Sequence, residues 1–291
     1  MTTGIITKGI GGFYYVACDD GGMVECRARG KFRKMNIKPC VGDRVNITVY
    51  GEQGAVEEIF PRKNFLIRPP VANIDRIAVV IAAALPSPDF FVMDRLIAYA
   101  EHSGIDVVVC VNKTDLADPA EIVSVYERAG YRVLPVCAAE NKGLDPLKEI
   151  ISCGVTAFAG NSGVGKSSIL NALGFSLETG SVSRKQHGRH TTRHVELMPY
   201  GEGGFVIDTP GFSLLDMTSL RAEEIPACFR EFKKLDPCEF GDCMHMGAKG
   251  CKVIKAVNDG IIAPSRYESY KAIYNELKDI KEWQRTNGAN D

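Results

Sequence analysis

The chain has 291 residues, of which 45% are hydrophobic and 24% charged, and its 35 basic residues nearly balance 36 acidic ones. This composition excludes a wholly disordered chain and a globally basic nucleic-acid binder, and the length predicts two or three domains. No apolar run reaches the roughly 18 residues of a membrane-spanning helix, so no membrane partner is expected. The first residues lack the pattern of a secretory signal. We therefore expect a cytoplasmic monomer whose ten cysteines stay reduced.

Residues 1–68 contain five short strand-like segments separated by glycines, at 4–8, 12–18, 22–28, 43–50 and 54–59. Short strands without a helical period are typical of a small barrel, and we predict an OB-fold. One stretch is crowded with cations, with Phe32 among them and Asp43 as the only opposing charge: Arg27, Arg29, Lys31, Arg33, Lys34, Lys38 and Arg44. Cations beside an aromatic ring suit RNA phosphates and bases, and a solvated basic loop is the alternative.

The pattern changes after Pro69 and Pro70. Apolar strand-like runs alternate with helical patterns; the strands are predicted at 76–84, 105–112, 131–136, 155–159 and 204–208, and the helices at 94–102, 122–129, 143–151 and 167–173. Strands buried on both faces and separated by helices predict a parallel α/β sheet.

A glycine-rich segment follows the strand at 155–159 and opens the next helix. It matches G-x-x-x-x-G-K-[ST], a phosphate-binding loop, with Gly160, Asn161, Ser162, Gly163, Val164, Gly165, Lys166 and Ser167, followed by Ser168. Backbone N–H groups would surround the phosphates, Lys166 would add charge on the β and γ oxygens, and Ser167 would bind Mg²⁺. The alternative is a glycine-rich turn with a surface lysine.

Two further segments complete a nucleotide site. Asp208-Thr-Pro-Gly211 ends the last strand, where Asp208 can hold the magnesium water shell and the Gly211 N–H can meet a γ-phosphate. Asp115, in the run Asn112, Lys113, Thr114 and Asp115, can accept hydrogen bonds from guanine N1–H and its 2-amino group, whereas adenine would leave that carboxylate unpaired. Asn112 would hold the loop and reach the base edge, and the Lys113 stem would pack on the base. An Asx turn is the alternative for this run.

Supporting contacts to the base are predicted after the strand at 131–136, where Cys137 and Ala138 can offer backbone groups. In ordinary GTPases the base-reading run follows the phosphate loop, whereas here it precedes it. This order is typical of a circularly permuted GTPase. A P-loop kinase or ATPase fused to RNA-binding domains is a competing class, and the guanine-reading run argues against it.

Residues 183–194 form a polar, aperiodic and basic segment between the phosphate loop and Asp208. Such a segment is typical of a switch loop, in which Thr191 or Thr192 would complete the magnesium shell. It can also face RNA, and a solvated basic loop is again the alternative.

Three cysteines and a histidine lie close together in the last part of the chain: Cys238, Cys243, His245 and Cys251. Three thiolates and an imidazole make a closed tetrahedral set, which predicts one structural Zn²⁺. Scattered core cysteines are the alternative. From about residue 219 helical patterns dominate, and the apolar face at 265–286 is predicted to pack against its own domain.

The chain as a whole resembles the ribosome small subunit-dependent GTPase A family of circularly permuted bacterial GTPases. The resemblance is carried by N-K-T-D, G-N-S-G-V-G-K-S, G-R-H-T-T-R-H and D-T-P-G in this order, by C-R-A-R-G-K-F-R-K before them and by the cysteine set after them. It implies a multidomain protein: an OB-fold RNA-binding domain at 1–68, a circularly permuted GTPase domain at 69–218 and a mostly helical zinc-binding domain at 219–291.

The resemblance also implies a function. The expected reaction is hydrolysis of GTP to GDP and phosphate during late maturation of the small ribosomal subunit, with turnover stimulated by that subunit and contacts to its rRNA. The family pattern favours Thr192 as the magnesium ligand. Phe212 follows Gly211 where Ras-like enzymes carry a water-orienting glutamine, and His190 matches a switch-loop histidine of the family. A nucleotide-gated RNA-binding module with incidental hydrolysis is the alternative function.

Overall fold

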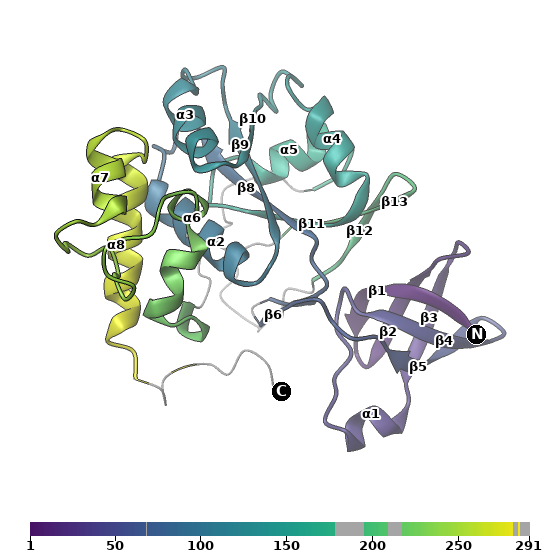
Figure 1. Ribbon diagram of the computed structural model, residues 1–291. Helices are drawn as coiled ribbons and strands as arrows, with labels where there is room; N and C mark the ends of the chain where they lie inside the picture. Colours follow the sequence, from purple (N-terminus) through teal and green to yellow (C-terminus); the bar gives the residue numbers. More distant parts are fainter. Residues whose placement is uncertain (68, 178–194, 209–216, 282–284, 286–291) are drawn as a thin grey trace, which may run out of the picture.

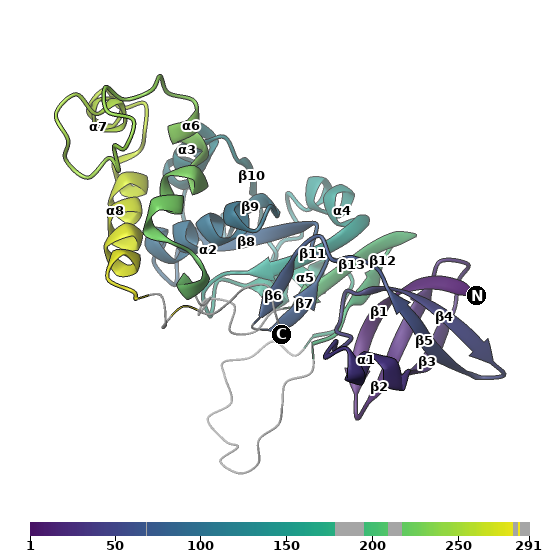
Figure 2. The same ribbon diagram turned by 60° about the horizontal axis from the view of Figure 1, so that its bottom comes forward.

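The computed structural model describes residues 1–67, 69–177, 195–208, 217–281 and 285 (Figure 1). A central sheet carries helices on both faces, and a separate barrel lies beside it. The barrel and the C-terminal helices lie at opposite ends of the molecule in both views (Figures 1 and 2). None of the helices in the described part of the chain has both the length and the apolar character that a membrane span requires.

The N-terminal part is a closed five-stranded barrel, which confirms the predicted OB-like fold. Its strands are joined in the order β1-β2-β3-β5-β4, with bounds β1 (Thr2–Ile10), β2 (Phe13–Cys18), β3 (Met23–Ala28), β4 (Arg44–Tyr50) and β5 (Gln53–Ile59). Inward side chains from all five strands fill its core: Ile6, Val16, Cys26, Val45, Ile47 and Val56. The buried ring of Phe32 joins this core from α1 (Gly30–Lys34). The sequence analysis did not predict this helix, because five residues are too few to display a helical period.

A short hairpin links the barrel to the sheet. Strands β6 (Phe65–Ile67) and β7 (Pro70–Ala72) pair with each other, and the backbone N–H of Ala72 donates to the carbonyl of Val41 at 2.9 Å. The fully buried carboxylate of Asp43 accepts the guanidinium of Arg62 at 2.7 Å. These contacts hold the linker against the barrel instead of leaving it free.

A second connection joins the barrel to the segment that precedes β12 (Met198–Tyr200). The pairing of β1 with β2 shifts register between Ile6 and Lys8, and the carbonyl of the intervening Thr7 accepts the N–H of Leu197 at 2.8 Å. Lys8 forms an ion pair with Glu196 at 2.7 Å. The barrel therefore contacts the chain immediately after residues 178–194, which lie outside the described part.

The central sheet has six strands in the order β10-β9-β8-β11-β13-β12. The strands β8 (Arg76–Ala82), β9 (Asp106–Asn112), β10 (Arg132–Pro135), β11 (Cys153–Ala159) and β13 (Gly203–Asp208) run parallel, and β12 pairs antiparallel to β13. The parallel sheet was predicted, but the three-residue edge strand β12 was missed because it is too short to show a pattern. The carboxyl ends of β9, β11 and β13 meet at one edge, and this edge carries the predicted nucleotide residues.

Helices cover both faces of the sheet. Apolar side chains of α4 (Asp145–Ile151) and α5 (Lys166–Ala172) pack on one face. On the other face, α2 (Phe90–His102) and α3 (Ala120–Ala129) share one continuous core with the C-terminal elements. These elements are η2 (Met217–Ser219), η3 (Ala222–Cys228), α6 (Arg230–Lys233), α7 (Lys252–Asn258) and α8 (Pro264–Lys278).

The apolar face of α8 packs against η3, as predicted, and also against α2. Tyr270, Ile273 and Leu277 are buried on this face. A buried charge cluster reinforces the contact: the guanidinium of Arg266 lies 2.6 Å from a carboxylate oxygen of Asp94 on α2 and 2.7 Å from one of Glu231 on α6. The C-terminal helices are thus packed into the core of the α/β unit.

Candidate functional site

The predicted phosphate loop connects β11 to α5 at the carboxyl edge of the sheet. Gly160, Gly163 and Gly165 have φ angles of 140°, 80° and 95°, a region that glycine adopts readily. A Cβ at Gly165 would lie 2.2 Å from Nδ2 of Asn112, and one at Gly160 would lie 2.2 Å from the carbonyl oxygen of Val80. Both positions therefore require glycine for space as well as for conformation.

Lys166 at the start of α5 and Asp208 at the end of β13 both lie at this edge, and their charges interact. The ammonium group of Lys166 donates to the carbonyls of Gly160 at 2.8 Å and Asn161 at 2.9 Å. Burial lowers the pKa of Lys166 and raises the pKa of Asp208, and the charge of each residue partly opposes the shift of the other. A partly buried cation and a partly buried carboxylate that influence each other's charge, with Ser167 in the first turn of α5, can hold a phosphate together with a hydrated divalent cation.

The base-reading run is joined to the phosphate loop by Asn112 at the end of β9. Its buried amide donates to the carbonyl of Val164 at 3.0 Å, and its oxygen accepts the N–H of Ala138 at 3.2 Å. Thr114 donates its hydroxyl to the carbonyl of Val136 at 3.2 Å. Asn112 thereby connects the three loops that sequence analysis assigned to the nucleotide.

Asp115 lies in the same cluster. The thiol of Cys137 donates to a carboxylate oxygen of Asp115 at 3.2 Å, so this cysteine contacts the base-reading side chain directly. We expected Cys137 to act through its backbone, and a contact between side chains 22 residues apart has no local sequence signal. Lys113 has a φ of 63°, and its ammonium group contacts the carbonyl of Leu85.

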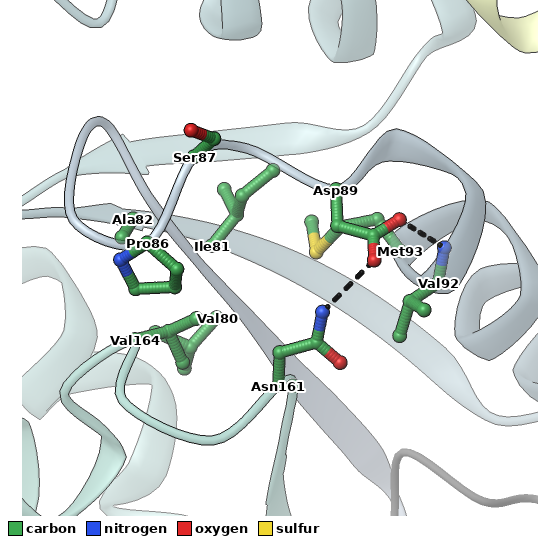
Figure 3. A pocket seen from close by; sticks show the side chains of 11 residues that line it. Val80, Ile81, Ala82, Pro86, Ser87, Asp89, Val92, Met93, Asn161 and Val164 are labelled. Carbon is green, nitrogen blue, oxygen red and sulfur yellow. Dashed lines mark hydrogen bonds between the residues drawn. The ribbon is translucent and has the colours of Figure 1, made fainter.

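A segment with no recognisable motif, residues 85–89 between β8 and α2, lies over the phosphate loop. Together with Asn161 and Val164, this segment lines a small cavity of about 10 Å³, room for about one water molecule (Figure 3). The carboxylate of Asp89 accepts the side-chain amide of Asn161 at 3.1 Å. The available signal was an aspartate five residues before the predicted helix at 94–102, which can indicate a helix cap but no partner in another loop.

The four predicted zinc ligands come together between α6 and α7. Their ligand atoms all lie within 4.8 Å of one another, and Nδ1 of His245 lies 3.3 Å from Sγ of Cys251 and 3.6 Å from Sγ of Cys238 and of Cys243. Ligand atoms of a tetrahedral zinc site with Zn–S bonds of about 2.3 Å are about 3.8 Å apart. The three thiols and the imidazole therefore fit one Zn²⁺ without rearrangement of the fold.

Around this cluster, α8 supplies hydrogen bonds to the loop backbone. Tyr267 donates its hydroxyl to the carbonyl of His245 at 2.7 Å, and Tyr270 donates to that of Met244. The ring of Phe232 meets the imidazole of His245 edge to face. These outer contacts fix the orientation of the ligand loop.

The basic stretch of the barrel is partly neutralised. Arg29 is paired with Glu57 at 2.6 Å and Arg44 with Asp19 at 2.7 Å, so Asp43 is not the only opposing charge. Within the described residues, no carboxylate lies at ion-pair distance from Arg33 or Lys38. Both line a surface cavity of about 580 Å³ that adjoins a second one of about 430 Å³ across Tyr14, and no acidic residue lines either cavity.

Four predicted site residues cannot be placed. His190, Thr191, Thr192 and Gly211 lie outside the described residues. All other predicted nucleotide residues lie at the carboxyl edge of the sheet, and the four zinc ligands form a separate cluster beside α8.

Comparisons with known proteins agree with this geometry. The RsgA N-terminal domain model matches residues 3–56, the RsgA GTPase model matches 59–218, and a 50S ribosome-binding GTPase model matches 155–286. The protein named small ribosomal subunit biogenesis GTPase RsgA is 43% identical in Agathobacter rectalis, covering 97% of this chain and 100% of that one. Its counterpart in Ruminiclostridium cellulolyticum is 44% identical, covering 98% and 96%.

Solved structures show the same architecture. YjeQ from Thermotoga maritima superimposes with a TM-score of 0.85 at 34% identity, covering 96% of this chain and 99% of that one. YloQ, described as a circularly permuted GTPase, gives a TM-score of 0.83 at 35% identity, covering 97% and 96%. The strand order and the site loops match that description, and the chain belongs to the RsgA GTPase family.

Proposed function

We propose that this protein hydrolyses GTP to GDP and phosphate during late maturation of the small ribosomal subunit. The single observation that carries the chemistry is the bond from Asn112 to Val164 at 3.0 Å, because it joins the base-reading run to the phosphate loop. The role in the subunit is supported by the names of the full-length relatives.

Guanine selection is assigned to Asp115. Its carboxylate would accept the N1–H and 2-amino groups of the base, while Cys137 contacts the same carboxylate and Ala138 offers its backbone. Adenine would leave the carboxylate unpaired, at a cost of about 1–3 kcal/mol. The stem of Lys113 would cover the base, and Thr114 would hold the loop through Val136.

Phosphate binding is assigned to the loop from Gly160 to Ser168. Its N–H groups and Lys166 would neutralise the β and γ oxygens. Ser167 and Thr192 would bind Mg²⁺, with Asp208 holding its water shell, and the ion would supply charge neutralisation at the transferred phosphoryl group. Gly211 would donate its N–H to the γ-phosphate, and His190 would position the attacking water.

We assign one structural Zn²⁺ to Cys238, Cys243, His245 and Cys251, a closed donor set with no position left for substrate. The two adjoining surface cavities on the barrel, lined by cations and aromatic rings, support an rRNA-binding surface. We propose three units, 1–68 for RNA, 69–218 for GTP and 219–291 for zinc, in a monomer that works in the cytoplasm.

The test measures GTP and ATP turnover by the full-length protein alone, with small subunits and with large subunits. We expect turnover of GTP only, raised tenfold or more by small subunits. Co-sedimentation under a GTP analogue and under GDP, with Asp115→Ala as the nucleotide-binding control, tests whether binding depends on the nucleotide. Stable binding to small subunits without any rise in turnover would instead identify an RNA-binding module with incidental hydrolysis.

A further inference from the structure

The segment at residues 85–89 contacts two loops of the proposed GTP site. The carbonyl of Leu85 accepts the ammonium group of Lys113 in the base-reading run. Pro86 lies beside the phosphate loop, with its Cδ 3.8 Å from the position of a Cβ on Gly163. The segment is therefore placed to influence the loop that would surround the phosphates.

Asp89 uses its two carboxylate oxygens for different partners. One oxygen accepts the N–H of Val92 at 3.1 Å and caps α2. The other accepts the side-chain amide of Asn161 at 3.1 Å, as the two dashed lines in Figure 3 show. Capping α2 requires only the bond to Val92. The second carboxylate oxygen can therefore hold Asn161 of the phosphate loop without weakening the cap.

The bond to Asn161 reaches Lys166 in one further step. The backbone carbonyl of Asn161 is one of the two acceptors of the Lys166 ammonium group, at 2.9 Å. A rotation of this peptide would move the acceptor and, with it, the position of the ammonium group. Asp89 thus opposes such a rotation through the side chain of the same residue.

Asp89 lies at the start of α2, a helix that is held in place by a buried ion pair. Asp94, five residues further along α2, is fully buried and accepts the guanidinium of Arg266 from α8 at 2.6 Å. A positioning group acts best from an element whose own place is fixed by packing. The cap of α2 meets this condition, because α2 lies between the sheet and the C-terminal helices.

We propose that Asp89 is a positioning residue of the phosphate loop: through Asn161 it sets the place of Lys166, and thereby the affinity for the β- and γ-phosphates of GTP. The inference rests on the proposed function, since it assumes that this loop binds GTP.

The test compares GTP affinity, measured with a fluorescent GTP analogue, against thermal stability in the full-length protein. Asp89→Ser keeps a good N-cap but loses the bond to Asn161. We expect its affinity to fall about threefold to tenfold because Lys166 is less well positioned, while the unfolding temperature falls by no more than about 6 °C, as for the loss of one hydrogen bond from the fold. Asp89→Asn restores affinity, because a flipped Asn161 amide accepts from the new side chain.

A double-mutant cycle isolates the contact. Asn161→Ala should weaken binding as much as Asp89→Ser does, and the double variant should be no worse than either. Asp145→Ser removes the same charge from the start of α4, where the side chain bonds only Lys148 among the described residues, and it should bind like wild type.

Unchanged affinity in Asp89→Ser, or additive losses in the double variant, would overturn this inference alone. Failure of the wild-type protein to bind the GTP analogue would overturn the proposed function itself.

Discussion

Replacement of Arg266 by methionine should destabilise the protein strongly. The guanidinium is 1% exposed and lies 2.6 Å from Asp94 and 2.7 Å from Glu231, whose side chains are 0% and 5% exposed. Removing the cation leaves two buried carboxylates without their partner, which costs about 3–5 kcal/mol. At about 2–4 °C per kcal/mol for a unit of this size, the unfolding temperature should fall by roughly 6–20 °C.

The stability lost in Arg266→Met should depend on pH. Burial raises the pKa of Asp94, and the charge of Arg266 opposes that shift, so the variant should raise it further. A carboxyl group whose pKa is higher in the folded than in the unfolded protein favours folding at low pH. This contribution to stability is lost as the pH rises through the folded-state pKa. The difference in unfolding free energy between wild type and Arg266→Met should therefore be smaller near pH 5 and larger near pH 8.

The assay is thermal unfolding by calorimetry at pH 5.5, 7 and 8.5. Lys148→Met removes an exposed ion pair of similar length, 2.8 Å, and should cost no more than about 1 kcal/mol. A triple variant, Asp94→Leu with Glu231→Met and Arg266→Met, should recover much of the stability because no buried charge remains. An unfolding temperature of Arg266→Met within 2 °C of wild type, or a deficit that is equal at all three pH values, would refute the reasoning.

Four further predictions concern the sites. Asp115→Asn should weaken GTP binding and admit XTP, whose 2-oxo group can accept from the new amide; a retained preference for GTP in competition binding would show that Asp115 does not read the base. Gly165→Ala should reduce GTP affinity at least tenfold because its Cβ would lie 2.2 Å from Nδ2 of Asn112, and equal nucleotide titrations would contradict this. Metal analysis of the natively purified protein should find one zinc per chain, and chelation should expose the loop around Cys243 to proteolysis; a protein free of zinc would refute the assignment. His190→Ala should lower subunit-stimulated turnover at least tenfold while sparing GTP affinity, and parallel losses in both would mark a residue needed for binding.

The sequence predicted the features that depend on short stretches of chain. The phosphate loop is a strand, a glycine-rich turn and a helix within about twenty residues, and its conformation depends on glycines inside that span. The three cysteines and His245 lie within 14 residues, so any compact loop brings them together. The permuted order of the motifs is itself a property of the sequence, and the strand order of the sheet agrees with it.

Other features depended on which elements become neighbours. Asp89 and Asn161 are 72 residues apart, and Asp94 and Arg266 are 172 apart, so no local pattern pairs them. The neutralisation of Arg29 by Glu57 likewise follows from the pairing of β3 with β5. The C-terminal helices share a core with α2, a contact between distant parts of the chain that no local sequence pattern indicates.

The sequence alone therefore determined the nucleotide and zinc motifs, because backbone geometry and ligand spacing are local properties. The tertiary structure decided how these motifs are held in place. It determined that residues 85–89 contact the phosphate loop, that Arg266 is buried against Asp94 and Glu231, and how the barrel contacts the segment before β12. Such contacts arise only when the sheet and its helices pack, since packing sets the distances between residues that the chain keeps far apart.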